Sequence, residues 1–184
     1  MTELTSEAAV VLRFWFEEAG PKSWWKPDPA FDALIRDRFG ALHGRANAGE
    51  LFAWRATPRG RLAEIILLDQ FSRNLYRDSA RAFAHDLAAL ALAQEAVSGG
   101  ALLVLEPPER AFLLLPYMHS ESREIHVVAE RLFRLHAPAE NLDFELRHKA
   151  IIDRFGRYPH RNRVLDRPST PEEIEFLKQP GSAF

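Results

Sequence analysis

Two stretches of this 184-residue chain repeat one arrangement of charged side chains. In each, two aliphatic residues precede an aspartate, and an arginine follows the aspartate four residues later. They are Leu67–Arg73 and Ile151–Arg157. A helix places residues that are four apart on the same face, so Asp69 is expected to pair with Arg73 and Asp153 with Arg157.

Both pairs lie on helix stripes that otherwise carry apolar residues, such as Leu62 and Ile65 before Asp69, and Leu146 before Asp153. A charge on a core-facing stripe has to be paired. A guanidinium offers more donors than one carboxylate accepts, so each arginine can also reach a second partner. The pairs therefore either brace helix ends or face a ligand, and the spacing leaves both roles open.

Further polar side chains follow these two pairs and the helix break expected at Pro116. They are Asn74 and Arg77, then His160, Arg161 and Asn162, and also His119 and Glu121. Side chains at helix ends and breaks can converge on a cleft without disrupting a core. We therefore expect one polar pocket where these helix ends meet.

The leading hypothesis is that this pocket binds a small anion, either a carboxylate or a phosphate. Arg73, Arg157 and Arg161 would donate hydrogen bonds to it, oriented by Asp69 and Asp153. Other polar side chains would complete the lining, namely Asn74, Arg77, His119, Glu121, His160 and Asn162.

Two alternatives remain open. His119 or His160 could move a proton in a hydrolase-like small-molecule enzyme, although no nucleophile occurs in a recognisable turn motif. A helical array could instead be a scaffold for a protein partner, by analogy of fold alone. That role requires a contiguous exposed apolar groove.

Neither a metal site nor a cofactor site is expected. His119 and Glu121 are two residues apart, which on a helix turns them about 200° from each other. Two other pairs have helical spacing but no third ligand nearby: His126 with Glu130, and Glu145 with His148. The chain also contains no glycine-rich phosphate loop and no dinucleotide-binding fingerprint.

These side chains must be positioned by helices, because the apolar residues follow helical spacing almost throughout. The predicted helices cover about 6–19, 29–42, 61–76, 83–97, 107–116, 125–133, 139–155 and 171–177. Pro116 and Pro138 are expected to interrupt the pattern. Of the adjacent Trp24 and Trp25, one should cover the core and the other should reach a neighbouring surface or the cleft. The fold class is all-α, either an antiparallel bundle or an α-solenoid of helix pairs, in one domain over 1–184.

The composition restricts the function further. The formal net charge is −2, so no overall field draws the chain to nucleic acid or anionic lipid. No stretch approaches the roughly 20 apolar residues of a spanning helix, and the start does not read as a secretory signal. The chain has no cysteine. We therefore expect a cytoplasmic protein with no membrane or nucleic-acid partner.

Several motifs in a fixed order carry a family resemblance. They are Phe14-Trp15-Phe16, Trp24-Trp25, Leu67–Arg77, Pro116–Glu121, Arg154–Asn162 and Ser169–Leu177. With them the chain resembles the bacterial DUF924 family over nearly its whole length. The resemblance implies an all-α, tetratricopeptide-like fold and no known activity. One departure is Leu165-Asp166-Arg167, where a Leu-Gly-Arg turn is expected.

Overall fold

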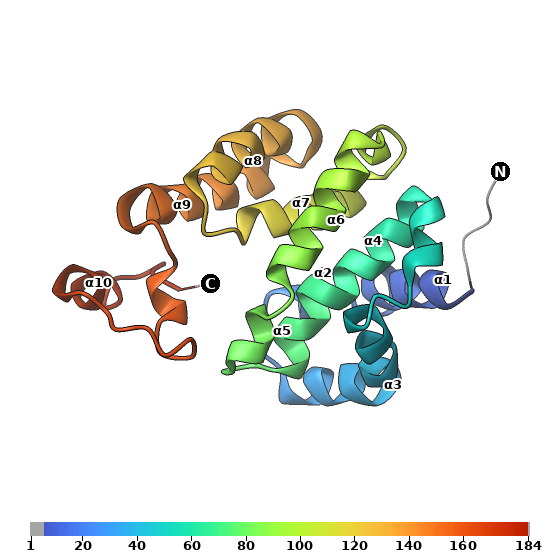
Figure 1. Cartoon of the computed structure of the whole chain (residues 1–184), viewed down its shortest axis with the longest axis horizontal. Coiled ribbons are helices and arrows are strands. Elements are labelled where there is room, and N and C mark those ends of the chain that lie inside the picture. Colours follow the sequence, from blue (N-terminus) through green and yellow to red (C-terminus); the bar gives the residue numbers. More distant parts are fainter. Residues whose placement is uncertain (1–5, 184) are drawn as a thin grey trace.

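The computed structural model describes residues 6–183, which form helices joined by short loops (Figure 1). No β-strand occurs among these residues, so the predicted all-α class is confirmed. The α-helices are α1 (Ser6–Arg13), α2 (Pro21–Trp24), α3 (Pro29–Asn47), α4 (Pro58–Ile66), α5 (Ser72–Leu75), α6 (Asp86–Ser98), α7 (Pro107–Met118), α8 (Arg123–His136), α9 (Ala139–Phe155) and α10 (Pro171–Phe176). Short 3₁₀ turns connect several of them, over Phe52–Ala56, Ala80–Phe83, Ala101–Leu103 and Pro159–Arg161.

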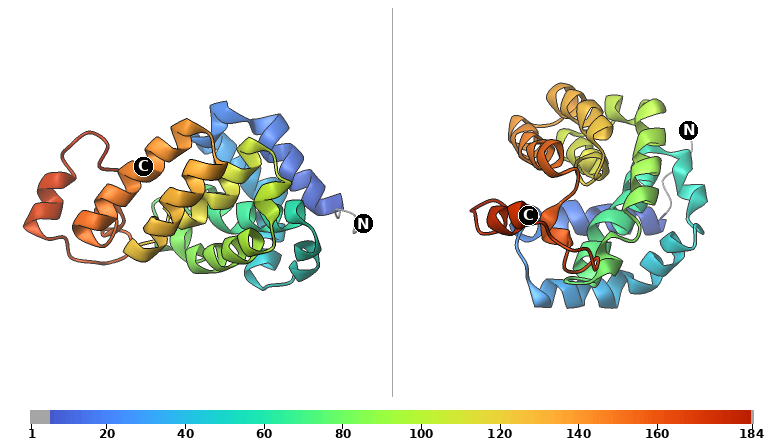
Figure 2. Two further views of the ribbon diagram at one scale, coloured as in Figure 1. Left: turned by 90° about the horizontal axis from the view of Figure 1, so that it is seen from above. Right: turned by 60° about the vertical axis from the view of Figure 1, so that its left-hand side comes forward.

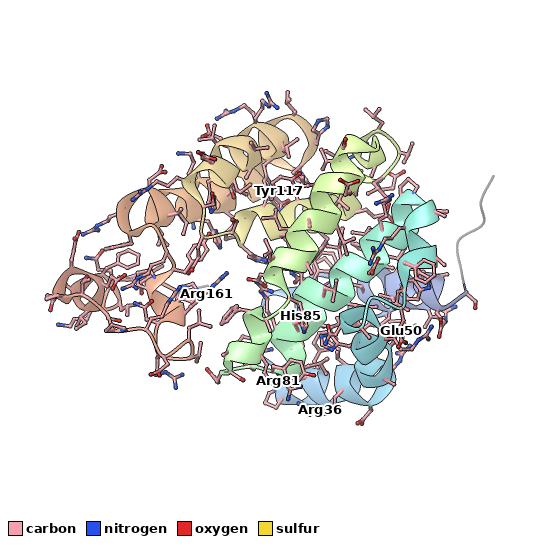
Figure 3. All side chains as sticks on the ribbon, in the orientation of Figure 1. Arg36, Glu50, Arg81, His85, Tyr117 and Arg161 are labelled. Atoms are coloured by element: carbon pink, nitrogen blue, oxygen red, sulfur yellow. The ribbon has the colours of Figure 1, made fainter. Side chains whose placement is uncertain are left out.

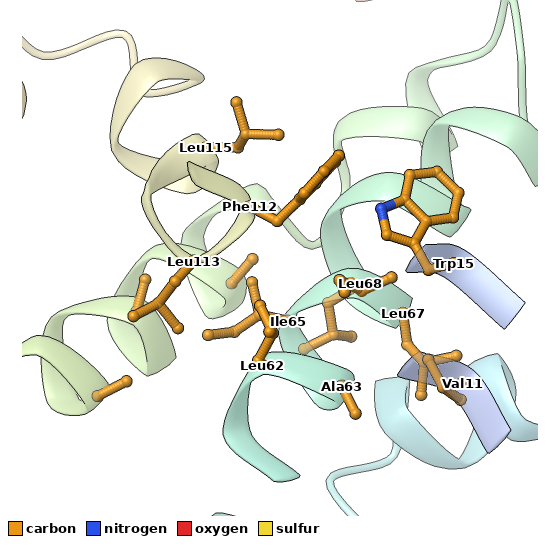
Figure 4. Close-up of a cluster of buried hydrophobic side chains, with 14 of the residues drawn as sticks. Val11, Trp15, Leu62, Ala63, Ile65, Leu67, Leu68, Phe112, Leu113 and Leu115 are labelled. Carbon is orange, nitrogen blue, oxygen red and sulfur yellow. The ribbon is translucent and has the colours of Figure 1, made fainter. Parts of the chain in front are cut away.

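Helix α4 lies at the centre of the apolar core, where it packs against α1, α6 and α7. Leu62, Ile65 and Leu67 are fully buried along α4 and its continuation. Figure 4 shows Leu113 of α7 and Trp15 of the segment after α1 in the same cluster. Burying such side chains is the main favourable contribution to folding, so this core fixes the helix ends that carry polar residues.

The helix predicted over 61–76 begins earlier, at Pro58, and continues without a break to Leu75. Its middle, Leu67–Phe71, is a π-helical turn that joins α4 to α5. Such turns are rare in proteins, and many of those that do occur lie at functional sites. This one contains Asp69, which is therefore held in the core by regular backbone on both sides.

The expected interruption at Pro116 is wrong. Helix α7 runs through Pro116 and ends at Met118, with the cap at His119. Every residue from Ala111 to Met118 is buried, and this packing outweighs the hydrogen bond that proline removes so close to the helix end. The real break covers residues 119–122, between α7 and α8.

Trp24 and Trp25 have different surroundings, as expected. The Nε1–H of Trp24 donates to the carbonyl oxygen of Trp15 at 2.9 Å, which ties α2 to the core. Trp25 is 60% exposed, and its ring stacks on Phe112 with 5.7 Å between centroids.

Helices α7, α8 and α9 pack one after another, and α9 ends at Gly156, which has a φ of 72°. Residues 156–183 then form the end of the molecule opposite α1 (Figure 2). Among residues 6–183, no helix combines the length and the apolar character that crossing a membrane requires.

Candidate functional site

A cavity of about 350 Å³ lies where the start of α6, the turn after α7 and the C-terminal segment meet. Its polar lining consists of Asp86, His119, Ser120, Glu121 and Arg161. Its larger apolar lining residues are Phe83, Leu87, Leu90, Pro116 and Leu165. Three of the proposed site residues, His119, Glu121 and Arg161, therefore lie on the wall of one cavity.

Asp69 lies directly behind this cavity and is only 1% exposed. His119 Nδ1 lies 2.8 Å from Asp69 Oδ1, and Arg73 Nη1 lies 3.1 Å from the same oxygen. Gln70 Nε2 donates to the other oxygen at 2.5 Å. Burial raises the pKa of Asp69, but the charge of Arg73 and the hydrogen bonds from His119 and Gln70 outweigh burial and hold the pKa well below its usual range. Asp69 is therefore an ionised carboxylate that only accepts hydrogen bonds.

The state of His119 follows from this partner. A carboxylate only accepts, so His119 Nδ1 must carry the proton in their hydrogen bond. Burial and the charge of Arg73 lower the pKa of His119, against the opposite effect of Asp69. The ring is therefore neutral near pH 7, with an unprotonated Nε2. Within residues 6–183, Nε2 has no hydrogen-bond partner, and the ring lines the cavity.

A chain of charges connects Asp69 to the C-terminal segment. Arg73 donates to both oxygens of Asp86, at 3.0 and 3.1 Å, in addition to its contact with Asp69. Arg161 Nη1 donates to Asp86 Oδ2 at 3.2 Å. The two carboxylates and the two guanidiniums balance in charge, as a buried ionic cluster requires.

Arg161 is the member of this cluster with unused donor capacity. Its side chain is 7% exposed, and its guanidinium lies 4.5 Å from the Phe83 ring centroid and 4.6 Å from that of Tyr158. Its Nε is buried and has no hydrogen-bond partner in the described part of the chain. Burial and the charge of Arg73 lower its pKa, against the charge of Asp86. Figure 3 shows Arg161 on the side of the C-terminal segment that faces α6.

Asn74 and Arg77 of the predicted site lie elsewhere. Asn74 Nδ2 donates to Asp32 Oδ1 at 2.8 Å, and Arg77 donates to both oxygens of Asp32, also at 2.8 Å. These bonds tie the end of α5 to the start of α3. Their geometry is that of a brace.

The expected pair between Asp153 and Arg157 is wrong. Asp153 has a side-chain exposure of 46% and pairs with Lys149 at 2.6 Å. Arg157 comes after Gly156, which ends α9, so the two residues no longer share a helix face. Arg157 instead forms a bidentate pair with Glu173, at 2.7 and 2.8 Å.

Asn162 and Glu121 also stabilise the C-terminal segment. Asn162 is buried, donates to Ser169 and Glu173, and accepts from Arg167. Glu121 accepts two hydrogen bonds from Arg167, at 2.6 and 3.0 Å. Glu121 reaches the cavity wall but is neutralised by that arginine.

His160 is half-buried and is not among the residues that line the cavity. Burial and the charge of Arg161 lower its pKa to about 4. The two proposed acid–base residues therefore differ in position, because of the two only His119 lies on the cavity wall.

No group of three histidine, aspartate or glutamate side chains suited to a metal ion occurs within residues 6–183. The turn at 119–122 is non-helical, as a His119–Glu121 ion site would need, but Arg167 occupies Glu121. His126 forms its ion pair with Glu145 of α9 in place of Glu130. Its Nδ1 lies 2.7 Å from Glu145 Oε1, and its Nε2 lies 2.9 Å from the Ser120 carbonyl oxygen.

Helical spacing gives no indication of Asp86, which joins Arg73 to Arg161. Its only local signal is its position in the first turn of α6, where the helix dipole favours an acidic residue. Its two partners lie 13 and 75 residues away, and no periodicity relates such positions.

Comparisons with known proteins agree with the resemblance. The family described as a bacterial protein of unknown function (DUF924) matches residues 11–181. A solved structure of a protein of unknown function from Agrobacterium tumefaciens is 37% identical, with a TM-score of 0.90 over 94% of this chain and 97% of that one. No curated protein matches the chain. The family match spans most of the chain, and the chain therefore belongs to the bacterial DUF924 family.

Proposed function

We propose that the cavity binds a small molecule with a carboxylate or phosphate group, and that Arg161 is the residue that anchors this group. The observation that supports the proposal most strongly is the guanidinium of Arg161, which lines the cavity and donates a single hydrogen bond within the described chain, from Nη1 to Asp86. A hydrogen bond with a charged group contributes about 1.5–3 kcal/mol, so a ligand oxygen that accepts from the remaining donors gains an interaction of this order.

The proposal narrows the set of arginines expected from the sequence. Arg73 is occupied by Asp69 and Asp86, and Arg157 is occupied by Glu173. We therefore assign Arg73 to holding Asp86 and Arg161 in place, and Arg157 to the C-terminal segment. The apolar wall of Phe83, Leu87 and Leu165 suits a ligand with a short hydrocarbon part. We expect the ligand to be a small metabolite of the cytoplasm.

A thermal-shift and calorimetric screen tests this proposal. The probes are inorganic phosphate and a set of short carboxylates and phosphate monoesters, measured on wild type, Arg161→Met and Arg163→Met. Arg163 is the matched control, because it lies two residues away with a side-chain exposure of 80%. A bound ligand at 100 times its dissociation constant should stabilise the wild type by about 2.7 kcal/mol.

We expect Arg161→Met to remain folded and lose the response, and Arg163→Met to retain it. Equal responses of both variants would place the anion elsewhere. No response of the wild type to any probe would remove the proposal.

A second candidate function is acid–base catalysis by His119, and the Asp69–His119 hydrogen bond favours it. A carboxylate that orients a histidine and stabilises its protonated form is the usual support of a general base. We assign this role to His119 and not to His160, because His119 lines the cavity. The interaction-scaffold alternative stays a prediction.

A further inference from the structure

We infer that the ligand carries a hydrogen-bond donor, such as a hydroxyl group, beside its anionic group, and that this donor binds to Nε2 of His119. The inference rests on the proposed function, because it adds a second contact to the ligand that Arg161 anchors. It assigns a substrate class: short hydroxy acids and phosphorylated alcohols with a free hydroxyl.

The surroundings of Asp69 fix its charge. Arg73, Gln70 and His119 all approach its two oxygens, and the residue is buried. The guanidinium of Arg73 lies 3.1 Å from Oδ1 and is always positively charged, so it stabilises the ionised carboxylate, which accepts from every partner. The remaining partners must donate as well.

The charge of Asp69 determines the tautomer of His119. Because Asp69 accepts, Nδ1 of His119 is protonated, and the neutral ring then leaves a lone pair on Nε2. Nδ1 faces the buried carboxylate, and the same ring lines the cavity, so Nε2 is the nitrogen available to a ligand. The wall thus presents an acceptor at His119.

The acceptor on His119 and the donors of Arg161 can contact the same ligand. Both residues line one cavity, so a ligand there meets a guanidinium and an imidazole lone pair. A molecule with an anion alone satisfies only Arg161. A molecule with an added hydroxyl satisfies both, and a methyl ether at that position does not, because its oxygen only accepts.

The same arrangement supplies a balanced proton transfer. The ligand O–H bond breaks, its electron pair stays on the oxygen, and the proton goes to Nε2. His119 becomes an imidazolium, which the Asp69 carboxylate stabilises. Such a transfer would use His119 as the base and Asp69 as the group that orients it.

Matched ligand sets test the inference by calorimetry at pH 7. One set is butanoate, 2-hydroxybutanoate, 3-hydroxybutanoate and their methyl ethers, and the other is propyl phosphate, 3-hydroxypropyl phosphate and its ether. For the hydroxyl position that fits, we expect the hydroxy compound to bind about five- to tenfold more tightly than the other two. His119→Phe should abolish this preference, and His136→Asn, at the end of α8, should preserve it.

Nitrogen-15 NMR of the imidazole rings provides a readout that needs no ligand. The His119 signal, assigned by its loss in His119→Phe, should show a protonated Nδ1 and an unprotonated Nε2 at pH 7. In Asp69→Asn the side-chain amide can donate to Nδ1, which moves the proton to Nε2 and removes the hydroxyl preference.

Each outcome decides a separate question. A wild-type ring protonated on Nε2 would overturn the inference whatever the variants do. Anions that bind through Arg161 without any hydroxyl preference would overturn it and leave the proposed function standing. The absence of binding by every probe would overturn both.

Discussion

The stretches Leu67–Arg73 and Ile151–Arg157 share a sequence pattern and have opposite roles in the structure. In the first, Asp69 is buried, pairs with Arg73 and orients His119 at the cavity. In the second, Asp153 is exposed and Arg157 reaches past the helix end to Glu173. The same residue types at the same spacing therefore support the cavity wall in the first stretch and the C-terminal segment in the second.

The difference comes from what surrounds each stretch. Residues 67–71 form a π-helical turn inside a continuous helical run, with α6 packed against it. Residues 151–157 cross the C-terminus of α9, where Gly156 takes a left-handed conformation. Spacing of four residues is informative only while the helix continues.

The largest contrast is expected between Asp69→Ala and Asp153→Ala. Removing Asp69 leaves Arg73 and His119 without their buried partner, which should lower the free energy of unfolding by about 3–5 kcal/mol. Removing the exposed Asp153 should change it by less than about 0.5 kcal/mol. Urea unfolding at pH 7 measures both.

Equal effects of the two substitutions would mean that the Asp69 network adds nothing beyond a surface pair. The circular dichroism spectrum of each variant before unfolding shows whether it is still helical.

A smaller effect is expected at the partner that Arg157 acquires in place of Asp153. Glu173→Gln should lower the free energy of unfolding by about 1–2 kcal/mol, between the values for exposed and buried ion pairs. Glu172→Gln is the matched control, because Glu172 is adjacent and has a side-chain exposure of 63%. It should leave stability nearly unchanged.

The Glu173 contribution should also depend on pH. Its hydrogen bond to Arg157 lowers its pKa from 4.5 to about 2, against the effect of burial. A lowered folded pKa means that the contribution is complete above pH 4.5 and is lost as the pH falls toward 2. The stability difference between wild type and Glu173→Gln should therefore shrink over that range, and a constant difference would contradict the assignment.

The smallest effect is expected for the pair that Asp153 does form. Lys149 and Asp153 are an exposed pair four residues apart on α9, worth about 0.3–0.5 kcal/mol. A double-mutant cycle with Lys149→Ala and Asp153→Ala should give this coupling at low salt and less of it at 1 M salt. A coupling that does not respond to salt would indicate a buried pair.

Local signals in the sequence predicted much of the fold. Asp28 caps α3 by accepting from the backbone of Ala30 and Phe31, and Thr170 and Glu173 form a capping box at the start of α10. Helix starts depend on neighbouring residues, so the sequence contains the information. The break predicted at Pro116 is absent, because the effect of this proline depends on the tertiary packing of α7.

Helical spacing predicted the pair of Asp69 with Arg73, and the structure contains it. The residue types of His119 and Arg161 indicated a polar site, but their contacts with Asp69 and Asp86 span 50 and 75 residues. Asp86 holds Arg161 in place through a contact across 75 residues, and nothing in its local sequence indicates that role. Such pairings are set by how helices pack, which periodicity alone does not specify.

The account depends most on the claim that Arg161, and not Arg157, receives an anion. Nitrogen-15 NMR of the arginine Nε–H groups, followed during titration with phosphate and 2-hydroxybutanoate, tests it directly. The account predicts a saturable shift of the Arg161 signal, identified by its loss in Arg161→Met, while the Arg157 signal, bound to Glu173, stays in place. An unmoved Arg161 signal, or equal movement of both signals, would contradict it.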